Sequence, residues 1–407
     1  MDKNTKLHDS EFAMVKVPQE ARKGFWALFV LMVGFTFFSA SMSVGARLGN
    51  GLNLSGFFAA IVIGGLILMT YTSLLAYVGS STGLSMDLLA RRSFGTIGSY
   101  LPSGLISFTQ IGWFGVGVAM FAYPVAELLG IDHWLLVIIG GILMTSTAYW
   151  GINALTMLSF VSVPLIAILG GASIFMATGE AGGFFNIFPS TGEMTVMAGA
   201  GMVVGSFISG GTATPNFVRF ARTTQIAVVT TAIAFLLGNS LMFLFGAVGG
   251  AATGQNDIFY VMIAQGLAIP AIIVLGLNIW TTNDSAIYSS GLGLSNITKM
   301  RKKTMTLVSG FIGTIAAIWL YNNFIGWLSF LSATLPPVGT ILILDYFINK
   351  SKYYGEEDAS NTVNVFAVSG VILGAAVANF VNWGIAPINA MVVAAVCYLV
   401  GEKVFKK

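Results

Sequence analysis

Near residue 280, four side chains with neutral oxygen atoms interrupt an otherwise apolar segment. They are Asn278, Thr281, Thr282 and Ser285, and their i, i+3, i+4, i+7 spacing places them on one face of a helix. Neutral oxygen atoms on one face of a membrane helix can form half of a site for an alkali cation, which we predict to be sodium. Small polar residues of this kind can also simply hold neighbouring helices together.

The other half of this site is predicted from a break in the first apolar segment. The run from Gly34 to Ser41, GFTFFSAS, places small and hydroxyl-bearing residues at the middle of that segment. Backbone groups without hydrogen bonds are costly in hydrocarbon, so such a break persists only where it lines a cavity inside the protein. We therefore expect the carbonyl oxygens near Gly34 and Phe37 to be free to bind the cation.

A second break is predicted half a chain later, in the segment 205–215, GSFISGGTATP. When the two runs are superposed, Phe207 takes the position of Phe37 and Ser209 takes that of Ser39. A matched pair of broken helices in the two halves of a membrane protein indicates the binding site of a transporter.

The third apolar segment carries Gln110, Trp113 and Gly117 at i, i+3 and i+7, so one helix face offers an amide, an indole ring and a gap. An amide both donates and accepts, so Gln110 is suited to pair with the lactam or amidine edge of a heterocycle. Trp113 and Phe207 can stack on opposite faces of such a ring, with Phe38 closing the pocket. In a chain with 31 Phe, ordinary packing is the competing interpretation of each aromatic.

Charged residues inside the predicted spans bear on the coupling ion and on the substrate. Proton coupling needs a titratable group within the membrane, and Asp284 is the one acidic residue well inside a span. Its role as a proton carrier and its role as a hydrogen-bond partner of a neighbouring helix both stay open. No Lys or Arg occupies the middle of a span, which disfavours strongly anionic substrates. We expect a neutral, planar, polar heterocycle.

The elements that must position these residues are membrane-spanning helices. Of the 407 residues, 56% are hydrophobic and 9% are charged, whereas soluble proteins average about 25% charged residues. Windows of roughly 20 apolar residues recur along the whole chain. They predict twelve spans, at 25–47, 54–79, 98–127, 133–151, 153–177, 196–218, 226–250, 268–296, 304–321, 324–347, 363–381 and 386–402.

The placement of basic residues predicts the orientation of these spans. If the even-numbered loops and both tails share one side, 18 of the 19 Lys and Arg residues lie there, and only Arg47 lies opposite. By the positive-inside rule this side and both termini are cytoplasmic, so the basic clusters need no nucleic-acid partner. The N-terminal region shows no cleavable signal sequence, and the single Cys397 excludes an intrachain disulfide. No nucleophile–base or metal-ligand cluster indicates an enzyme.

The order of the spans predicts an internal repeat. We expect a cytoplasmic tail at 1–24, a first repeat of five helices at 25–178 and a second at 195–347. Helices 11 and 12 and the cytoplasmic C-terminus follow at 362–407. Because each repeat has an odd number of spans, the second is inverted relative to the first, as in many secondary transporters.

Several strings in this chain resemble those of the nucleobase–cation symporter family. They are RKG at 22–24, TFFSAS at 36–41, QIGWFGVG at 110–117, VGSFIS at 204–209 and LNIWTTN at 277–283. The resemblance covers essentially the whole chain and is specific, because several long strings match in order. It implies an all-α membrane protein of the LeuT-type fold, with two inverted five-helix repeats, two further helices, broken helices 1 and 6, and alternating access.

The resemblance also implies a substrate and the residues that bind it. Cytosine would lie between spans 1, 3, 6 and 8, with its pyrimidine ring between Trp113 and Phe207 and its edge paired with Gln110. The remaining residues that would line or complete the pocket are Phe38, Ser206, Ser209, Asn278 and Asn283. Sodium would be held by the Thr281 and Thr282 hydroxyls and by the carbonyls of Asn278, Gly34 and Phe37.

The function expected from sequence is therefore the import of cytosine with sodium across a bacterial cytoplasmic membrane. No cofactor other than the coupling ion, and no obligate protein partner, is expected. The nearest alternative is a proton-coupled permease for a related nucleobase, hydantoin or allantoin. A channel or a non-transporting nutrient receptor is a further alternative, and the paired broken helices and the absence of a charged pore ring disfavour a channel.

Overall fold

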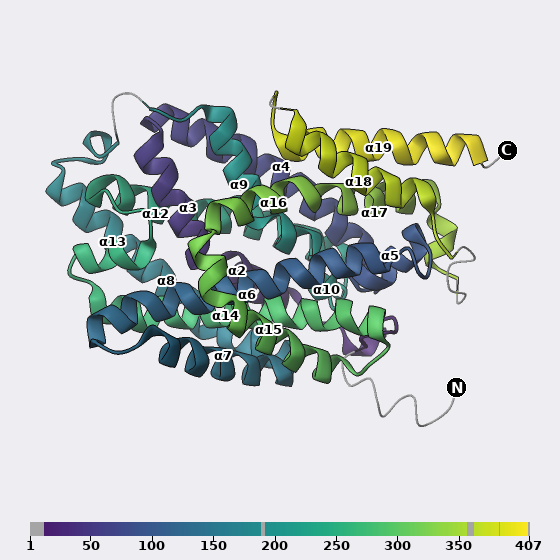
Figure 1. Ribbon diagram of the computed structural model, residues 1–407, viewed down its shortest axis with the longest axis horizontal. Coiled ribbons are helices and arrows are strands. Elements are labelled where there is room, and N and C mark those ends of the chain that lie inside the picture. Colours follow the sequence, from purple (N-terminus) through teal and green to yellow (C-terminus); the bar gives the residue numbers. More distant parts are fainter. Residues whose placement is uncertain (1–11, 189–191, 356–361, 382, 406–407) are drawn as a thin grey trace.

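The computed structural model describes residues 12–188, 192–355, 362–381 and 383–405, and almost all of them are helical. The long helices run side by side along the long axis of the molecule (Figure 1). The helices of the first half are α2 Phe25–Thr36, α3 Ser39–Gly51, α4 Leu54–Thr82, α5 Met86–Phe94, α6 Tyr100–Leu129, α7 His133–Trp150 and α8 Ile152–Glu180.

The second half has the same helical character. Its helices are α9 Val196–Thr212, α10 Pro215–Val218, α11 Thr224–Ile233, α12 Asn239–Thr253, α13 Ile258–Ala264, α14 Ala268–Thr298, α15 Lys302–Asn322, α16 Phe324–Thr334, α17 Pro336–Ile348, α18 Val365–Phe380 and α19 Ala386–Phe405. A π-helical turn, η3 (Ala234–Gly238), joins α11 to α12, and the short 3-10 turns are η1 Gln19–Ala21, η2 Phe184–Asn186 and η4 Lys350–Tyr353.

Helix ends follow from local sequence. α4 begins where the Asn53 side chain accepts a hydrogen bond from the backbone N–H of Gly56, and it ends at Gly83, which has a left-handed φ of 73°. The amide oxygen satisfies one of the free N–H groups of the first turn. Glycine adopts the left-handed conformation that ends the helix without steric cost.

Each predicted span corresponds to a helix or a consecutive helix pair in the described part of the chain. Nine of these are long and apolar enough to cross a membrane, and the α2–α3 pair makes a tenth, bent by 50°. Two of the twelve predicted spans do not meet these requirements of length and apolar composition. α14 has 31 residues but carries the polar run around residue 280, and α18 has only 16 residues.

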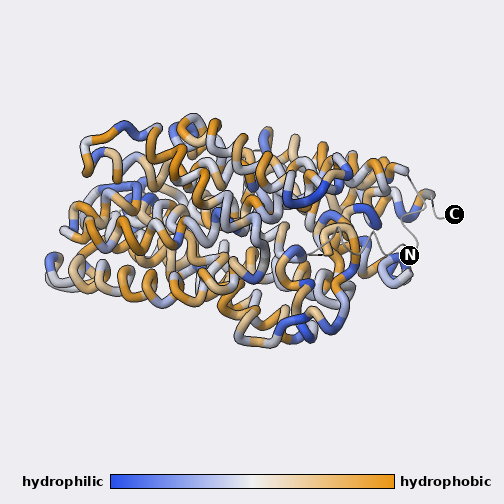
Figure 2. The backbone as a smooth tube through the Cα atoms, turned by 90° about the horizontal axis from the view of Figure 1, so that it is seen from below, coloured by the Kyte–Doolittle hydropathy of each residue, from blue (hydrophilic) through white to orange (hydrophobic). Residues whose placement is uncertain are grey.

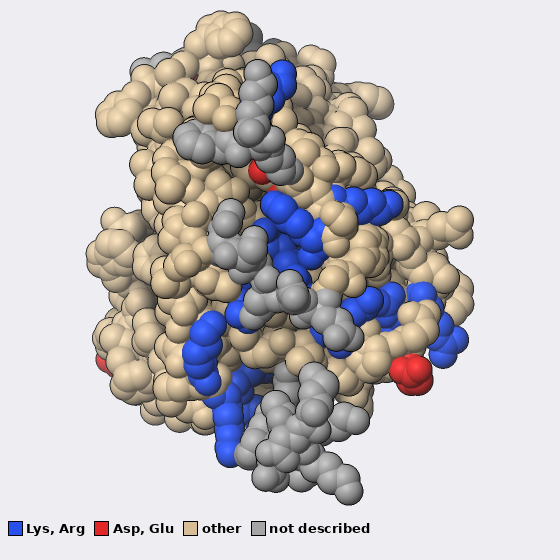
Figure 3. Space-filling view, turned by 90° about the vertical axis from the view of Figure 1, so that its right-hand side faces the viewer, with Lys and Arg blue, Asp and Glu red and all other residues tan. Residues whose placement is uncertain are grey.

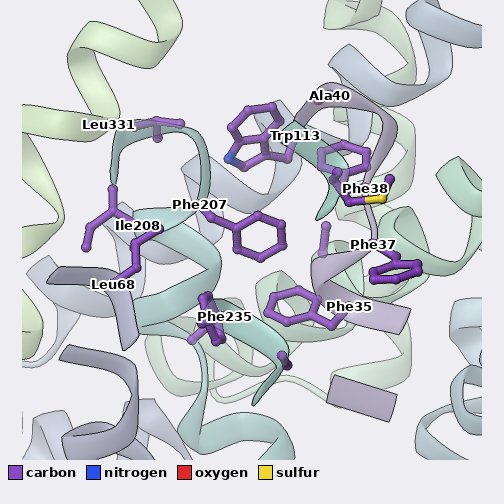
Figure 4. Close-up of a cluster of buried hydrophobic side chains, with 14 of the residues drawn as sticks. Phe35, Phe37, Phe38, Ala40, Leu68, Trp113, Phe207, Ile208, Phe235 and Leu331 are labelled. Carbon is purple, nitrogen blue, oxygen red and sulfur yellow. The ribbon is translucent and has the colours of Figure 1, made fainter. Parts of the chain in front are cut away.

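The break in the first span lies at the predicted place. α2 ends at Thr36, Phe37 and Phe38 are non-helical, and α3 starts at Ser39. Because the last carbonyls of a helix have no partner within it, those at the break can bond to other elements, and the carbonyl of Phe37 accepts from the side chain of Asn278. The break lies among buried aromatic side chains, not at the molecular surface (Figure 4).

The predicted second break is much smaller than the first. α9 continues without interruption through Phe207 and Ser209 to Thr212, and only residues 213–214 separate it from α10. The two helices count together as one span, with no bend above 40°. The interruption therefore lies inside the predicted segment 205–215, at its C-terminal end, whereas Phe207 and Ser209, the residues superposed on the first break, are helical.

Gly210 and Gly211 allow close packing, which explains why the helix continues through them to Thr212. A Cβ on Gly210 would come within 2.9 Å of the Phe35 ring, and a Cβ on Gly211 would come within 2.9 Å of Thr72. Small residues let membrane helices approach each other closely, so a glycine-rich run does not by itself require an unwound backbone.

The helices that carry the predicted site pack together in the middle of the bundle. α6 lies along α14, α3 along α12, and α4 along α9. Hydrophobic residues dominate the long helices, while hydrophilic residues are concentrated towards the ends of the bundle (Figure 2). The division into two inverted repeats remains a prediction.

Basic side chains gather at one end of the bundle, as Figure 3 shows for the end where α19 terminates. The N-terminal segment crosses this end: the N–H of Val17 donates to Gly83, and the N–H of Lys23 donates to Phe220. Arg47, by contrast, lies at the far end of α3, with its guanidinium 5.8 Å from the ring centre of Phe324.

Candidate functional site

A small, narrow cavity lies between the first span, α6, α9 and α14. Its walls are mostly aromatic and amide side chains and contain no charged residue. The lining residues are Phe35, Phe38, Gln110, Trp113, Ser206, Phe207, Gly210, Thr282, Asn283 and Ala286. Six of the eight residues predicted to bind substrate are in this set.

The aromatic residues around the cavity contact each other edge to face. The rings of Phe38 and Trp113 have centroids 5.5 Å apart, and those of Phe35 and Phe207 are 5.2 Å apart. Figure 4 shows these rings grouped where the first span breaks. Edge-to-face contacts of this kind fix the orientation of the rings that line the cavity.

Ser209 connects the two polar groups of α6, although it is not in the wall of the cavity. Its hydroxyl oxygen accepts a hydrogen bond from Nε1 of Trp113 at 2.8 Å and lies 3.4 Å from Nε2 of Gln110. All three side chains are buried. Ser209 therefore orients the indole and the amide, whereas the hydroxyl of Ser206 donates to the carbonyl of Val203 within its own helix.

Asn283 lies at the α14 wall of the cavity. Its Nδ2 donates to the carbonyl of Phe114 at 3.1 Å and contacts the sulfur of Met144 at 3.2 Å. Its Oδ1 is buried and has no hydrogen-bond partner among the described residues. An acceptor without a partner at a cavity wall is a natural position for a ligand donor.

The predicted cation ligands meet where α14 contacts the break in the first span. The carbonyl oxygen of Asn278 lies 2.7 Å from Oγ1 of Thr281 and 3.3 Å from Oγ1 of Thr282. The Asn278 side chain reaches the break itself: Nδ2 donates to the carbonyl of Phe37, and Oδ1 accepts from the hydroxyl of Ser39 at 2.8 Å. Asn278 therefore joins the two helices and does not line the cavity.

Gly34, the fifth predicted cation ligand, lies in the last turn of α2. A Cβ at this position would overlap the hydroxyl of Ser159, so α8 approaches the break very closely here. Ser159 was not singled out from the sequence, where a lone serine in an apolar span carries little signal. Its hydroxyl donates to the carbonyl of Leu155.

Asp284 points away from the cavity, towards α7. Its Oδ1 accepts a hydrogen bond from Oγ1 of Thr147 at 2.8 Å, and Thr147 in turn accepts one from Nε1 of Trp280 at 2.7 Å. One interpretation of Asp284 is a hydrogen bond to a neighbouring helix. The bond from Thr147 on α7 is such a contact.

Aromatic and charged residues fill the space between the cavity and the basic end of the bundle. The rings of Phe35 and Phe217 are 4.7 Å apart, and those of Phe217 and Tyr288 are 6.0 Å apart. Arg219, one of the basic residues that the sequence places on the cytoplasmic side, is fully buried and donates to the carbonyl of Phe12 and the hydroxyl of Tyr288. No pattern in the sequence predicts a buried arginine in this position.

Asp87, on the non-spanning helix α5, belongs to the same region. Its Oδ1 accepts a hydrogen bond from the hydroxyl of Ser103 at 2.6 Å. Burial raises the pKa of Asp87 to about 6, although the Ser103 hydrogen bond and the charge of Arg219 act in the opposite direction. The side of the cavity that faces the basic end is therefore closed by packed, hydrogen-bonded side chains.

Long apolar helices around a small uncharged cavity, beside a broken helix, define a membrane transporter for small molecules. The chain belongs to the family of permeases for cytosine/purines, uracil, thiamine and allantoin, whose sequence model matches residues 16–401. The family resemblance predicted from sequence is thereby confirmed. The chain is a nucleobase-transport permease and not an enzyme.

Two curated relatives show how close this relationship is. The chain is 52% identical to the cytosine permease of Escherichia coli (strain K12) over 397 residues, which cover 96% of this chain and 94% of the relative. It is 24% identical to the hydantoin permease of Microbacterium maritypicum, over 70% of this chain and 64% of that protein.

A solved structure confirms the fold. Mhp1, a nucleobase-cation-symport-1 family transporter in a closed conformation with bromovinylhydantoin bound, matches with a TM-score of 0.82 at 19% identity. The match covers 95% of this chain and 94% of Mhp1. At this identity the similarity establishes the LeuT-type fold, and the roles of individual side chains rest on the geometry described above.

Proposed function

We propose that this protein imports cytosine together with sodium across the bacterial cytoplasmic membrane, by alternating access. The observation that carries this proposal is the position of Asn278 and Thr282. Asn278 bonds to the broken first span, while Thr282 belongs both to the cavity wall and to the cluster of predicted cation ligands. Ion and substrate would therefore bind as neighbours. The 52% identity to a cytosine permease supports the choice of substrate.

The cavity suits a flat, neutral ring with polar edges. The rings of Trp113 and Phe207 supply stacking surfaces, and stacking of a base on an aromatic side chain contributes about 1–3 kcal/mol. The amides of Gln110 and Asn283 supply donors and acceptors at the edge of the ring. A ring with the wrong pattern of donors would leave these buried groups unpaired, which supports discrimination among nucleobases.

The proposed sodium site would couple ion binding to the shape of the cavity. Sodium between the Thr281 and Thr282 hydroxyls and the carbonyls of Gly34, Phe37 and Asn278 would hold α14 against the end of α2. A ligand shifts a conformational equilibrium only through different affinities for the two states. Because the two sites share Thr282, we propose that sodium favours the state in which the cavity is formed, and that cytosine and sodium increase each other's affinity.

The basic end is proposed to be cytoplasmic, in agreement with the positive-inside rule. The buried contacts of Phe217, Arg219 and Tyr288 then close the cytoplasmic path to the cavity. Opening of this region and closure of the opposite end would complete the transport cycle.

The test is uptake of labelled cytosine into vesicles that contain the purified protein. An inward sodium gradient, a sodium-free condition and a pH gradient without sodium separate the possibilities. Accumulation driven by sodium and competed by unlabelled cytosine is the expected result. Accumulation driven only by the pH gradient would replace sodium coupling with proton coupling, and uptake of hydantoin or allantoin but not cytosine would replace the substrate.

A further inference from the structure

The orientation of the Asn283 carboxamide is determined by its two neighbours. The carbonyl oxygen of Phe114 can only accept a hydrogen bond, so the Asn283 atom 3.1 Å from it must be the nitrogen. The sulfur of Met144, 3.2 Å from the same nitrogen, is also an acceptor, although a weak one. Both amide hydrogens are therefore occupied, and the amide group cannot turn over without placing its oxygen against two acceptors.

Gly117 makes the space in which this amide lies. A Cβ on Gly117 would overlap Oδ1 of Asn283 and come within 2.9 Å of Nδ2. Gly117 shares one face of α6 with Gln110 and Trp113, so the gap in that face lies beside the cavity wall. The gap predicted from sequence is thus occupied by the side chain of Asn283.

Together these contacts leave Oδ1 as a buried acceptor with no partner among the described residues. We propose that Gly117 and Met144 are positioning residues, which hold the Asn283 amide as a fixed hydrogen-bond acceptor for an N–H group of the substrate. An aminopyrimidine presents its exocyclic amino group as a donor. The corresponding oxopyrimidine would place a carbonyl oxygen against Oδ1, and this pairing of two acceptors would reject it. The proposal rests on the cytosine-binding function proposed above.

The experiment measures the affinity of the purified protein for cytosine and for uracil, in saturating sodium, by calorimetry. Gly117→Ala is expected to displace the amide and to lower the ratio of cytosine to uracil affinity at least 10-fold. The half-saturating sodium concentration of this variant should stay within twofold of the wild-type value. Gly104→Ala is the matched control on the same helix, because its nearest new contact would be 3.8 Å away, at the side chain of Ile297. This control should keep the wild-type ratio.

A double-mutant cycle separates positioning from a general packing effect. If Gly117 acts through Asn283, then Gly117→Ala should have no further effect on the affinity ratio once Asn283→Ala is present. Equal losses for cytosine and uracil in Gly117→Ala, or additive effects in the double variant, would overturn the proposal. If wild-type protein binds no cytosine, the proposed function fails instead, so the two failures are distinguishable.

Met144→Leu provides a second test that does not depend on added volume. Leucine has a similar size but offers no acceptor, so one amide hydrogen is released and Asn283 is held by Phe114 alone. The affinity ratio is expected to fall about threefold to tenfold, with folding and sodium affinity retained. An unchanged ratio would remove Met144 from the proposal, and an unchanged ratio in both variants would overturn it entirely.

Discussion

The indole nitrogen of Trp113 donates a hydrogen bond to the hydroxyl oxygen of Ser209 over 2.8 Å, and this bond ties α6 to α9 at the wall of the cavity. Both side chains are buried, so the bond is made out of contact with water. It fixes the plane of the indole ring, which is the surface proposed to stack on the substrate. A hydroxyl outside the cavity wall thus orients a ring that lines the cavity.

Replacing this hydroxyl tests that relationship. Ser209→Ala leaves Nε1 of Trp113 without its acceptor and removes a neighbour of Gln110. An unpaired buried donor costs about 1–3 kcal/mol, so cytosine affinity measured by calorimetry should fall about 10-fold. Ser146→Ala, at an exposed serine that bonds only to its own helix, is the control. Equal affinities of Ser209→Ala and wild type would show that the indole is held by packing alone.

The threonine pair on α14 is expected to control the response to sodium. Thr281→Ala removes one proposed cation ligand, so half-maximal cytosine uptake should need about 10-fold more sodium, while uptake at saturating sodium is largely retained. Thr298→Ala is the matched control, because this exposed threonine on the same helix bonds to the carbonyl of Leu294. A sodium response that Thr281→Ala leaves unchanged would contradict the proposed site.

Asp87 should make stability depend on pH. Because burial raises its pKa from 3.8 to about 6, the folded protein retains a proton that the unfolded chain has lost. Its stabilising contribution is present below about pH 4 and is lost as pH rises to about 6, at up to about 1.4 kcal/mol per unit of pKa difference. Between pH 4.5 and 6.5, Asp87→Asn should therefore show a smaller decrease in Tm than wild type.

Thermal unfolding in detergent at a series of pH values checks this expectation. The comparison is between the two slopes of Tm against pH, because the absolute Tm of the variant also reflects its altered bond to Ser103. Parallel curves for wild type and Asp87→Asn would show that other groups cause the pH dependence.

Glycines at the interface of α3 and α12 are expected to determine stability. A Cβ on Gly246 would overlap the backbone carbonyl of Met42, which cannot move aside as a flexible side chain could. Gly246→Ala should therefore force the helices apart and destabilise the protein by about 1–3 kcal/mol or more, lowering its Tm in detergent. Gly201→Ala, where nothing lies within 4 Å of the added Cβ, should leave Tm nearly unchanged. A similar Tm for both variants would contradict the packing argument.

Helical periodicity explains why much of the cavity could be predicted. Gln110 and Trp113 share one face of a single helix, as do Asn278, Thr281 and Thr282 on another, so spacing alone indicates that each group acts together. The break at Phe37 was also visible, because hydroxyl and glycine residues in mid-span need a buried environment. In the segment 205–215 the helix continues to Thr212 before it is interrupted, since Gly210 and Gly211 make room for neighbouring side chains.

The sequence by itself determined that this chain is a polytopic membrane permease, which residue types recognise its ligand, and where the first span opens. These features depend on composition and on spacing within one helix, which the chain order contains directly. Only the tertiary structure decided that Ser209 holds Trp113, that Asn283 fills the gap at Gly117 and that Arg219 is buried. Such pairs join helices far apart in sequence, and their geometry depends on how closely those helices pack.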